Sequence, residues 1–302
     1  MSDSLSEGIS GNGPSILIVY HKSSDHLYCD DGFAAAFAAW LHFKDKAIYL
    51  PAIHGQEIPI ERFQSKMVFF LDFSYDLPIM QKIEAVSDSL VVIDHHKSVI
   101  DQAKDHPAFS ESSIDHSGCV LAWYYFHDPN RLTPLPLLFA HIEDNDLWRN
   151  QLTDTRAFIQ RLRLEPYQFE HWEKLLATLQ NDQQKNYQYF VEQGRLLQRQ
   201  IIKQCESLVH QAFWVTLAGV RGLAVNANRA YASELGQMLA EQSGTFAAIF
   251  VVLPEGLIDV SLRSNKSGCD VSLIAQAYGG GGHVRAAGFR FRDHSLLKRI
   301  LV

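Results

Sequence analysis

The segment Val91-Val92-Ile93-Asp94-His95-His96-Lys97 is an apolar run that ends in an acid and two imidazoles. A short apolar run of this kind, bounded by polar residues, is typical of a buried strand. Similar runs occur at 16–20 and 67–71, and patterns of helical period follow them at 31–42 and 77–85. Strands that alternate with helices predict βαβ units and therefore a parallel sheet.

Acidic residues close or follow these apolar runs: Asp31, Asp72 and Asp94. The carboxyl ends of parallel strands lie along one edge of the sheet, where ligands bind. A further cluster, Glu143-Asp144-Asn145-Asp146, follows the helical pattern of 135–142. A single acid after a strand usually caps the next helix, but several carboxylates beside imidazoles repel one another unless a divalent cation neutralises them. Without a thiolate majority, such ligands favour manganese, with magnesium as the lesser option, over structural zinc.

A second unusual stretch lies near the C-terminus, where four consecutive glycines, 279–282, precede His283 and Arg285. Four glycines cost more backbone entropy than a turn requires. Such loops are used where backbone N–H groups wrap an anion beside a hydrogen-bonding or cationic side chain. The stretch therefore predicts an anion-binding loop, and a flexible hairpin is the alternative interpretation.

The length of 302 residues suits two domains. We expect a metal-binding domain over 1–150, a helical linker over 151–213 that contains one long helix from about 183 to 211, and a second domain over 214–302. Residues 214–302 carry nine Lys/Arg and six Asp/Glu, a net +3, which leaves −10 for the rest of the chain. This asymmetry suits a metal site in the first part and an anionic substrate in the second.

The net charge and composition limit the kinds of partner that the protein can bind. The net charge of −7 argues against a protein that grips long duplexes through phosphate neutralisation. The four cysteines have no paired spacing, so neither a disulfide framework nor a zinc finger is indicated. The first thirteen residues are polar and no apolar run approaches the length of a membrane span, which predicts a cytoplasmic protein with no membrane partner.

Two motifs in the same chain resemble those of a known family. Asp94-His95-His96 is similar to the motif that names the DHH phosphoesterases, and Gly280-Gly281-Gly282-His283 with Ala286-Ala287-Gly288 is similar to the signature of their DHHA1 domain. The group includes short-oligonucleotide phosphodiesterases, adenosine bisphosphate phosphatases and single-strand exonucleases of the RecJ type. The resemblance runs from Ile16 to Phe291 and implies an α/β fold, with a doubly wound parallel sheet followed by a smaller α/β domain.

The resemblance also implies a two-metal centre in which Asp72 bridges the cations. Asp94 would orient His95, and His96 would lie nearer the scissile phosphate, so Asp94 and His96 are the expected catalytic residues. The expected metal ligands are His26, Asp31, Asp72, His95 and Asp144.

The first motif departs from the family pattern, because Cys29 stands two positions before Asp31 where many relatives have an acid. His26 is preferred as the ligand by a small margin over His21, which directly follows the first strand. Cys29 itself is either part of the site or a buried small hydrophobe.

In the second domain the resemblance implies that a basic strand residue and the glycine-rich loop bind substrate, which gives Arg263, Gly280, Gly281, Gly282 and His283. An exposed strand charge is the alternative for Arg263. The expected function is manganese-dependent hydrolysis of short oligonucleotides or small nucleotide phosphoesters; whether the chain forms a homodimer is left open. The alternatives are an exopolyphosphatase-like phosphatase of small phosphorylated metabolites and a catalytically weak nucleotide-binding sensor.

Overall fold

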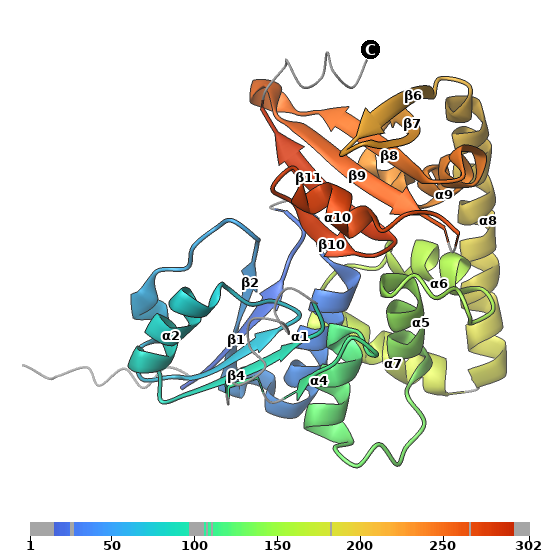
Figure 1. The fold of residues 1–302 in the computed structure, drawn as a ribbon. Coiled ribbons are helices and arrows are strands. Elements are labelled where there is room, and N and C mark those ends of the chain that lie inside the picture. The colour runs from blue at the N-terminus through green and yellow to red at the C-terminus, as the bar shows by residue number, and fades with distance from the viewer. Residues whose placement is uncertain are drawn as a thin grey trace, which may run out of the picture. The chain divides into compact units, whose positions relative to one another are not determined.

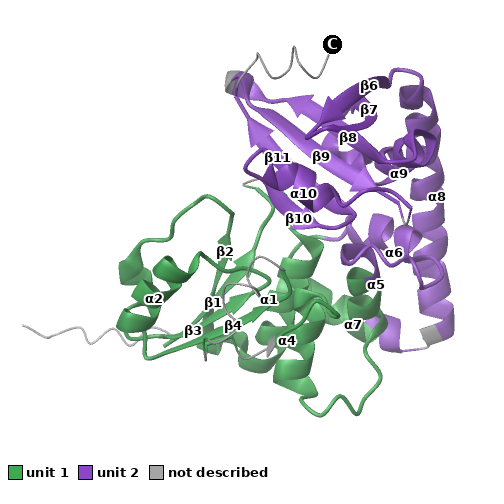
Figure 2. Ribbon diagram, viewed as in Figure 1, with its two compact units in different colours: residues 1–143, 166–177 green, residues 144–165, 178–302 purple. Residues whose placement is uncertain are grey.

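The structure, a computed structural model, describes residues 15–24, 27–96, 106, 108–109, 111–181, 183–265 and 267–292. The chain forms two compact units (Figure 2). The first spans residues 1–143 and 166–177, and the second spans 144–165 and 178–302. The segment predicted as a linker, 151–213, is therefore divided between the two units, and the chain passes from one to the other three times.

The first unit is built on a five-stranded sheet in the order β2-β1-β3-β4-β5, and all of its strand pairs are parallel (Figure 1). Its strands are β1 (Ile16–His21), β2 (Ala47–Ala52), β3 (Met67–Leu71), β4 (Ser89–Asp94) and β5 (Glu111–Ser112). This is a doubly wound order, in which successive crossovers reverse direction between β1 and β3. The predicted parallel sheet is confirmed.

Helices cover both faces of this sheet because the strand residues alternate between them. Phe70 packs in one cluster with Met80 and Ile83 of α2, whereas the ring of the preceding Phe69 lies 5.5 Å from that of Phe126 in α4. The helices of this unit are α1 (Asp30–Phe43), α2 (Leu77–Val86), α4 (Gly118–His127), most of α5 (Leu137–Asp146) and most of α7 (Phe169–Gln180), with short 3-10 turns at Lys44–Lys46 and Ile60–Phe63.

The late helix α7 completes the core of the first unit. Trp172 is fully buried, and its ring lies 4.8 Å from Phe33 and 5.9 Å from Phe37, both on α1. Phe169 stacks on Trp40 at 5.6 Å. The aromatic face of α1 is thus covered by a segment that follows it by more than a hundred residues.

The second unit contains a six-stranded sheet in the order β10-β11-β9-β8-β7-β6, antiparallel except for the parallel pair β7–β8. Its strands are β6 (Phe213–Leu217), β7 (Val220–Asn226), β8 (Phe246–Val252), β9 (Ile258–Ser264), β10 (Gly281–His283) and β11 (Ala286–Phe291). Its helices are α6 (Thr155–Leu162), α8 (Gln183–Val209), α9 (Ala232–Ser243) and α10 (Val271–Gln276), with 3-10 turns at Arg229–Tyr231 and Pro254–Gly256. This second sheet confirms the predicted α/β character of the C-terminal part.

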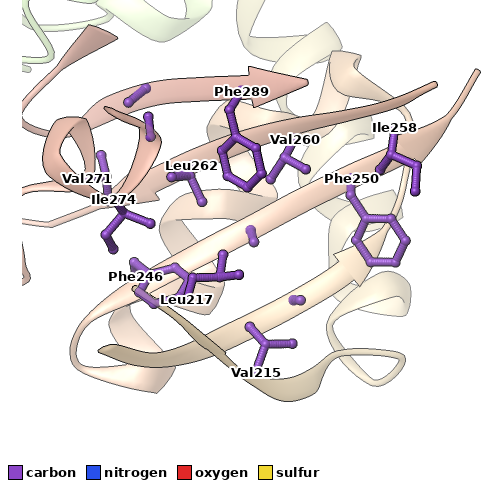
Figure 3. Close-up of a cluster of buried hydrophobic side chains, with 14 residues drawn as sticks. Val215, Leu217, Phe246, Phe250, Ile258, Val260, Leu262, Val271, Ile274 and Phe289 are labelled. Carbon is purple, nitrogen blue, oxygen red and sulfur yellow. The ribbon is translucent and has the colours of Figure 1, made fainter. Parts of the chain in front are cut away.

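Strand β8 shows how the second core is divided. Phe246 and Phe250 face a cluster that α10 joins through Val271 (Figure 3). The intervening Ala247 and Ile249 face the opposite cluster, which contains residues of α8 and α9. Among the residues that the structure describes, no helix is both long enough and apolar enough to cross a membrane.

Candidate active site

The candidate site lies at the carboxyl edge of the first sheet. His21 is the last residue of β1, Asp72 directly follows β3, and Asp94 is the last residue of β4, so parallel pairing brings all three to one edge. Asp72 has a φ of 53°, a left-handed conformation that Asp tolerates better than most residues. Its backbone N–H donates to the carbonyl of Ile93 at 2.9 Å, which keeps this turn beside β4.

The two carboxylate oxygens of Asp72 face different partners. Oδ1 lies 3.1 Å from Nε2 of His95, whereas Oδ2 lies 3.4 Å from Nδ1 of His21 and 3.8 Å from Sγ of Cys29. Only 1% of Asp72 is exposed. Burial by itself would raise its pKa, but the interactions with His21 and His95 and the charge of His96 hold the pKa well below its usual range. Asp72 is therefore negatively charged, and each of its two oxygens faces a different group of side chains.

Asp31 is fixed in the first turn of α1 by the start of α4. Its Oδ2 and Oδ1 accept hydrogen bonds from the backbone N–H groups of Gly118 at 2.7 Å and Cys119 at 3.1 Å. Its Oδ2 also lies 3.6 Å from Nε2 of His95. Asp31, Asp72 and His95 thus form a fully buried group whose ligand atoms lie within 4.8 Å of one another.

Asp94 is paired with His96 rather than with His95, which differs from its predicted role. Its Oδ1 contacts Nδ1 of His96 at 2.7 Å and accepts the backbone N–H of His96 at 3.0 Å. The turn after β4 folds His96 back onto this oxygen. Burial alone would lower the pKa of His96, but the charge and hydrogen bond of Asp94 raise it. The pKa of Asp94 is lowered, because the charge and hydrogen bond of His96 outweigh burial.

The structure adds one histidine that sequence reasoning missed. His54 follows β2, and its ring lies 5.0 Å from that of His21 and 4.6 Å from that of Phe73. Desolvation among these rings, together with the charges of His21 and His96, lowers the pKa of His54 to about 4. The position of His54 could have been found only by predicting strand β2, which it follows. That strand was not predicted, because Pro51 interrupts its short apolar run.

Two of the predicted metal ligands do not appear in these groups. His26 lies outside the described residues, whereas its alternative His21 lies beside Asp72. Asp144 belongs to the second unit. The carboxylate of Asp144 accepts hydrogen bonds from the backbone of Gln151 at 2.8 Å and from the hydroxyl of Thr155 at 2.5 Å. In this arrangement it organises the turn after α5, and its role as a ligand stays a prediction.

In the second unit, Arg263 is partly buried rather than an exposed strand charge. Its guanidinium lies 5.4 Å from the ring of Trp148, and a Cβ on Gly236 would come within 2.5 Å of its Cγ. Burial and then the positive charges of Arg229 and Arg163 lower the pKa of Arg263 to about 10. Nε is buried and has no hydrogen-bond partner within the described part of the chain. A desolvated guanidinium beside like charges is suited to an anionic ligand.

The glycine-rich stretch is a tight hairpin more than an open loop. Gly282 pairs with Ala287 across β10 and β11, and a Cβ on Gly282 would meet the Cα of Ala287 at 2.6 Å. The N–H of Gly280 donates to the carbonyl of Ala275 at 2.9 Å, so it closes α10. A Cβ on Gly281 would meet nothing within 4 Å, and Nε2 of His283 lies 3.8 Å from the carboxylate of Asp146. Close backbone packing therefore explains Gly280 and Gly282, while Gly281 borders open space.

Comparisons with known proteins support the resemblance found in the sequence. The model of the DHHA1 domain matches residues 217–301. Oligoribonuclease NrnB of Bacillus subtilis (strain 168) is 23% identical over 310 residues, an alignment that covers 89% of this chain and 73% of NrnB. These matches support the resemblance of the chain to the DHH/DHHA1 phosphoesterases.

Two further comparisons bear on the length and fold of the chain. Uncharacterized protein R106 of Acanthamoeba polyphaga mimivirus is 29% identical over 286 residues, which are 88% of this chain and 66% of that protein. The chain thus spans slightly less than two thirds of that relative. A solved DHH domain from a member of a family of ribosomal proteins has a TM-score of 0.54 at 14% identity, covering 95% of this chain and 85% of that one. This likeness concerns the fold.

The donors at the sheet edge fit a divalent cation. Asp31 and Asp72 supply carboxylate oxygens and His95 supplies an imidazole nitrogen, all buried and within 4.8 Å. Buried carboxylates this close repel one another unless they are neutralised. Carboxylate and imidazole donors suit several divalent metals, so the group can serve as a metal centre.

Proposed function

We propose that this protein is a cytoplasmic, manganese-dependent phosphoesterase that hydrolyses short oligonucleotides or small nucleotide phosphoesters. The observation that carries the proposal is the position of Asp72 between two groups of donors, with Oδ1 toward His95 and Oδ2 toward His21. A buried carboxylate whose two oxygens face different sets of donors is suited to a pair of cations. Mixed carboxylate and imidazole donors support manganese.

Each site residue has a proposed role. Asp31, Asp72 and His95 hold the metal. When bound, divalent cations polarise phosphoryl oxygens and lower the pKa of a coordinated water. Asp94 fixes the ring of His96 through Nδ1, and His96 is the proposed contact to the phosphate. His26 and Asp144 are retained as proposed ligands on the family resemblance alone.

The second unit supplies the proposed substrate contacts. Arg263 offers a desolvated guanidinium for a phosphate, and its packing against Trp148 and Gly236 restricts the side chain. His283 and the open side of Gly281 are the further proposed contacts. The name of the relative NrnB, an oligoribonuclease, supports short oligonucleotides over polyphosphate as the substrate.

The net charge of the chain bears on the length of the substrate that it can bind. Proteins that track long single strands combine a basic groove with stacking aromatics, whereas the part of this chain before residue 214 carries a net charge of −10. We therefore propose a preference for substrates of about two to five nucleotides, or for a mononucleotide-like phosphoester.

A length series of labelled oligonucleotides, with polyphosphate in parallel, tests this function. The full chain is stripped of metal with a chelator and reconstituted with manganese or magnesium. We expect no turnover without metal, restoration by manganese, and rates that fall as the substrate lengthens. Rates that rise steadily beyond about ten nucleotides would indicate a RecJ-like exonuclease, faster release of phosphate from polyphosphate would favour a polyphosphatase, and nucleotide binding without turnover would indicate a sensor.

A further inference from the structure

Cys29 occupies a specific position beside the metal centre. It is the residue that precedes α1, with φ −90° and ψ 128°, and its carbonyl accepts the N–H of Phe33 at 3.0 Å. Its Sγ lies 3.8 Å from Oδ2 of Asp72. Like the other three cysteines, it forms no disulfide. The start of α1 therefore directs a thiol toward the central carboxylate, on the side away from the oxygen that faces His95.

The spacing of three donors on this side is that of metal ligands. Nδ1 of His21 and Oδ2 of Asp72 are 3.4 Å apart, and with Sγ of Cys29 they form a group whose atoms all lie within 4.8 Å. Donors that share one cation are about 3–4 Å apart, because each is about 2.0–2.3 Å from the metal. The separations from Asp72 Oδ2, 3.4 Å and 3.8 Å, fit this range.

This group differs in chemistry from its neighbour. Asp31, Asp72 and His95 provide oxygen and nitrogen donors but no sulfur. His21, Cys29 and Asp72 provide nitrogen, sulfur and oxygen. The two groups share Asp72 through different carboxylate oxygens. One edge of the sheet thus presents a hard set of donors and a softer set side by side.

We infer that the thiolate of Cys29 is a metal ligand, which binds a cation together with His21 and Asp72. The inference rests on the proposed two-metal centre and specifies its second position. Thiolates select softer metals such as zinc, whereas carboxylate-rich sets suit manganese and magnesium. The two positions are therefore unequal, and the position at Cys29 retains zinc or cobalt more tightly than the position at Asp31 and His95.

Cobalt(II) is the probe, because a thiolate bound to it gives a sulfur-to-cobalt charge-transfer band in the near ultraviolet. The metal-free full chain is titrated with cobalt, and bound metal is counted by equilibrium dialysis. We expect the band in the wild type and in Cys269→Ser, which removes a cysteine of the other unit. We expect its loss in Cys29→Ser. In Cys29→Asp, cobalt still binds without the band, and preference shifts toward manganese.

The outcomes separate this inference from the proposed function. Cobalt bound to the wild type without the band, or a band that persists in Cys29→Ser, overturns the role of Cys29 and leaves the phosphoesterase intact. If the protein binds no cobalt and also hydrolyses its substrate without metal, the metal centre itself is overturned. If the variants fail to fold, alkylation of the wild type decides: bound zinc should slow the modification of Cys29 but not of Cys269, and equal rates with and without zinc contradict the inference.

Discussion

A Cβ atom on Gly118 would lie 2.6 Å from the Cβ of Asp72 and 3.0 Å from Oδ2 of Asp31. The first residue of α4 therefore approaches the two central carboxylates so closely that only glycine fits. We expect Gly118→Ala to displace both carboxylates, lower manganese affinity at least tenfold, and destabilise the fold by about 1–3 kcal/mol. Isothermal titration with manganese and thermal unfolding measure the two effects.

Gly194→Ala is the matched control for this substitution. A Cβ on Gly194 would approach the carbonyl oxygen of Ala157 to 1.9 Å, a similar overpacking within the second unit. It should lower the unfolding temperature without changing manganese affinity. If Gly118→Ala binds manganese like the wild type, the tight approach of α4 is not what positions the carboxylates.

Asp72→Asn separates the charge of Asp72 from its shape. Asn fills the same volume and, like Asp, tolerates the left-handed backbone of this position, so the fold should persist. The loss of the shared anion should abolish metal binding and reduce turnover far below a tenth of the wild-type rate. Turnover above a tenth, a deficit under about 1.4 kcal/mol, would rule out the bridging role; circular dichroism checks that the variant is folded.

Arg263→Lys should lower kcat/KM at least tenfold although it keeps the charge. A lysine loses the planar, bidentate fork and the contact with Trp148. Arg290→Lys is the control, because Arg290 makes an exposed pair with Asp259 at 3.0 Å, and exposed pairs contribute little. If the two variants have equal kinetics, Arg263 is an ordinary charged residue on a strand and does not contact the substrate.

His283→Ala should raise KM or lower kcat without changing manganese affinity, because the buried donor group consists of Asp31, Asp72 and His95 and does not include His283. Asp146→Asn serves as a companion variant, since Asp146 lies 3.8 Å from Nε2 of His283. Calorimetric titration of manganese into both variants is the direct measurement. A large fall in affinity on replacement of His283 would place it among the metal ligands.

A fragment of residues 1–150 should aggregate or unfold, because it lacks α7. Without Trp172 and Phe169, the aromatic face of α1 is exposed at Phe33 and Trp40. A fragment of residues 1–180 restores α7 and should be more soluble and more helical by circular dichroism. Equal behaviour of the two fragments would show that α7 is dispensable to the first unit.

The sequence predicted the elements whose signals are local. The apolar runs ending at Asp94 and Asp72 became β4 and β3 with boundaries within a residue or two, and the long polar segment became α8. Short or interrupted strands were missed: β2 contains Pro51, and β10 consists of two glycines and His283. Such strands form because a neighbouring strand pairs with them, which no local pattern records.

The site was predicted in its residue types but only partly in its pairings. The strand-end positions of Asp72 and Asp94 follow from a parallel sheet, so their convergence could be predicted from the sequence. The partner of Asp94 depends on how the turn after β4 folds His96 back, and the proximity of His54 depends on where β2 joins the sheet. Both are set by tertiary packing.

The three passages of the chain between the units constrain how such a protein can change by recombination. A gene fusion with one junction in residues 144–168 would separate α7 from the helix α1 that it covers. The α7 of the fusion partner would then meet an aromatic face that it does not match. Exchanging the second unit with that of a relative requires matched junctions near 143, 165 and 177. The two units are therefore expected to be inherited together, and substrate preference to diverge by point substitution within the second unit rather than by exchange of whole modules.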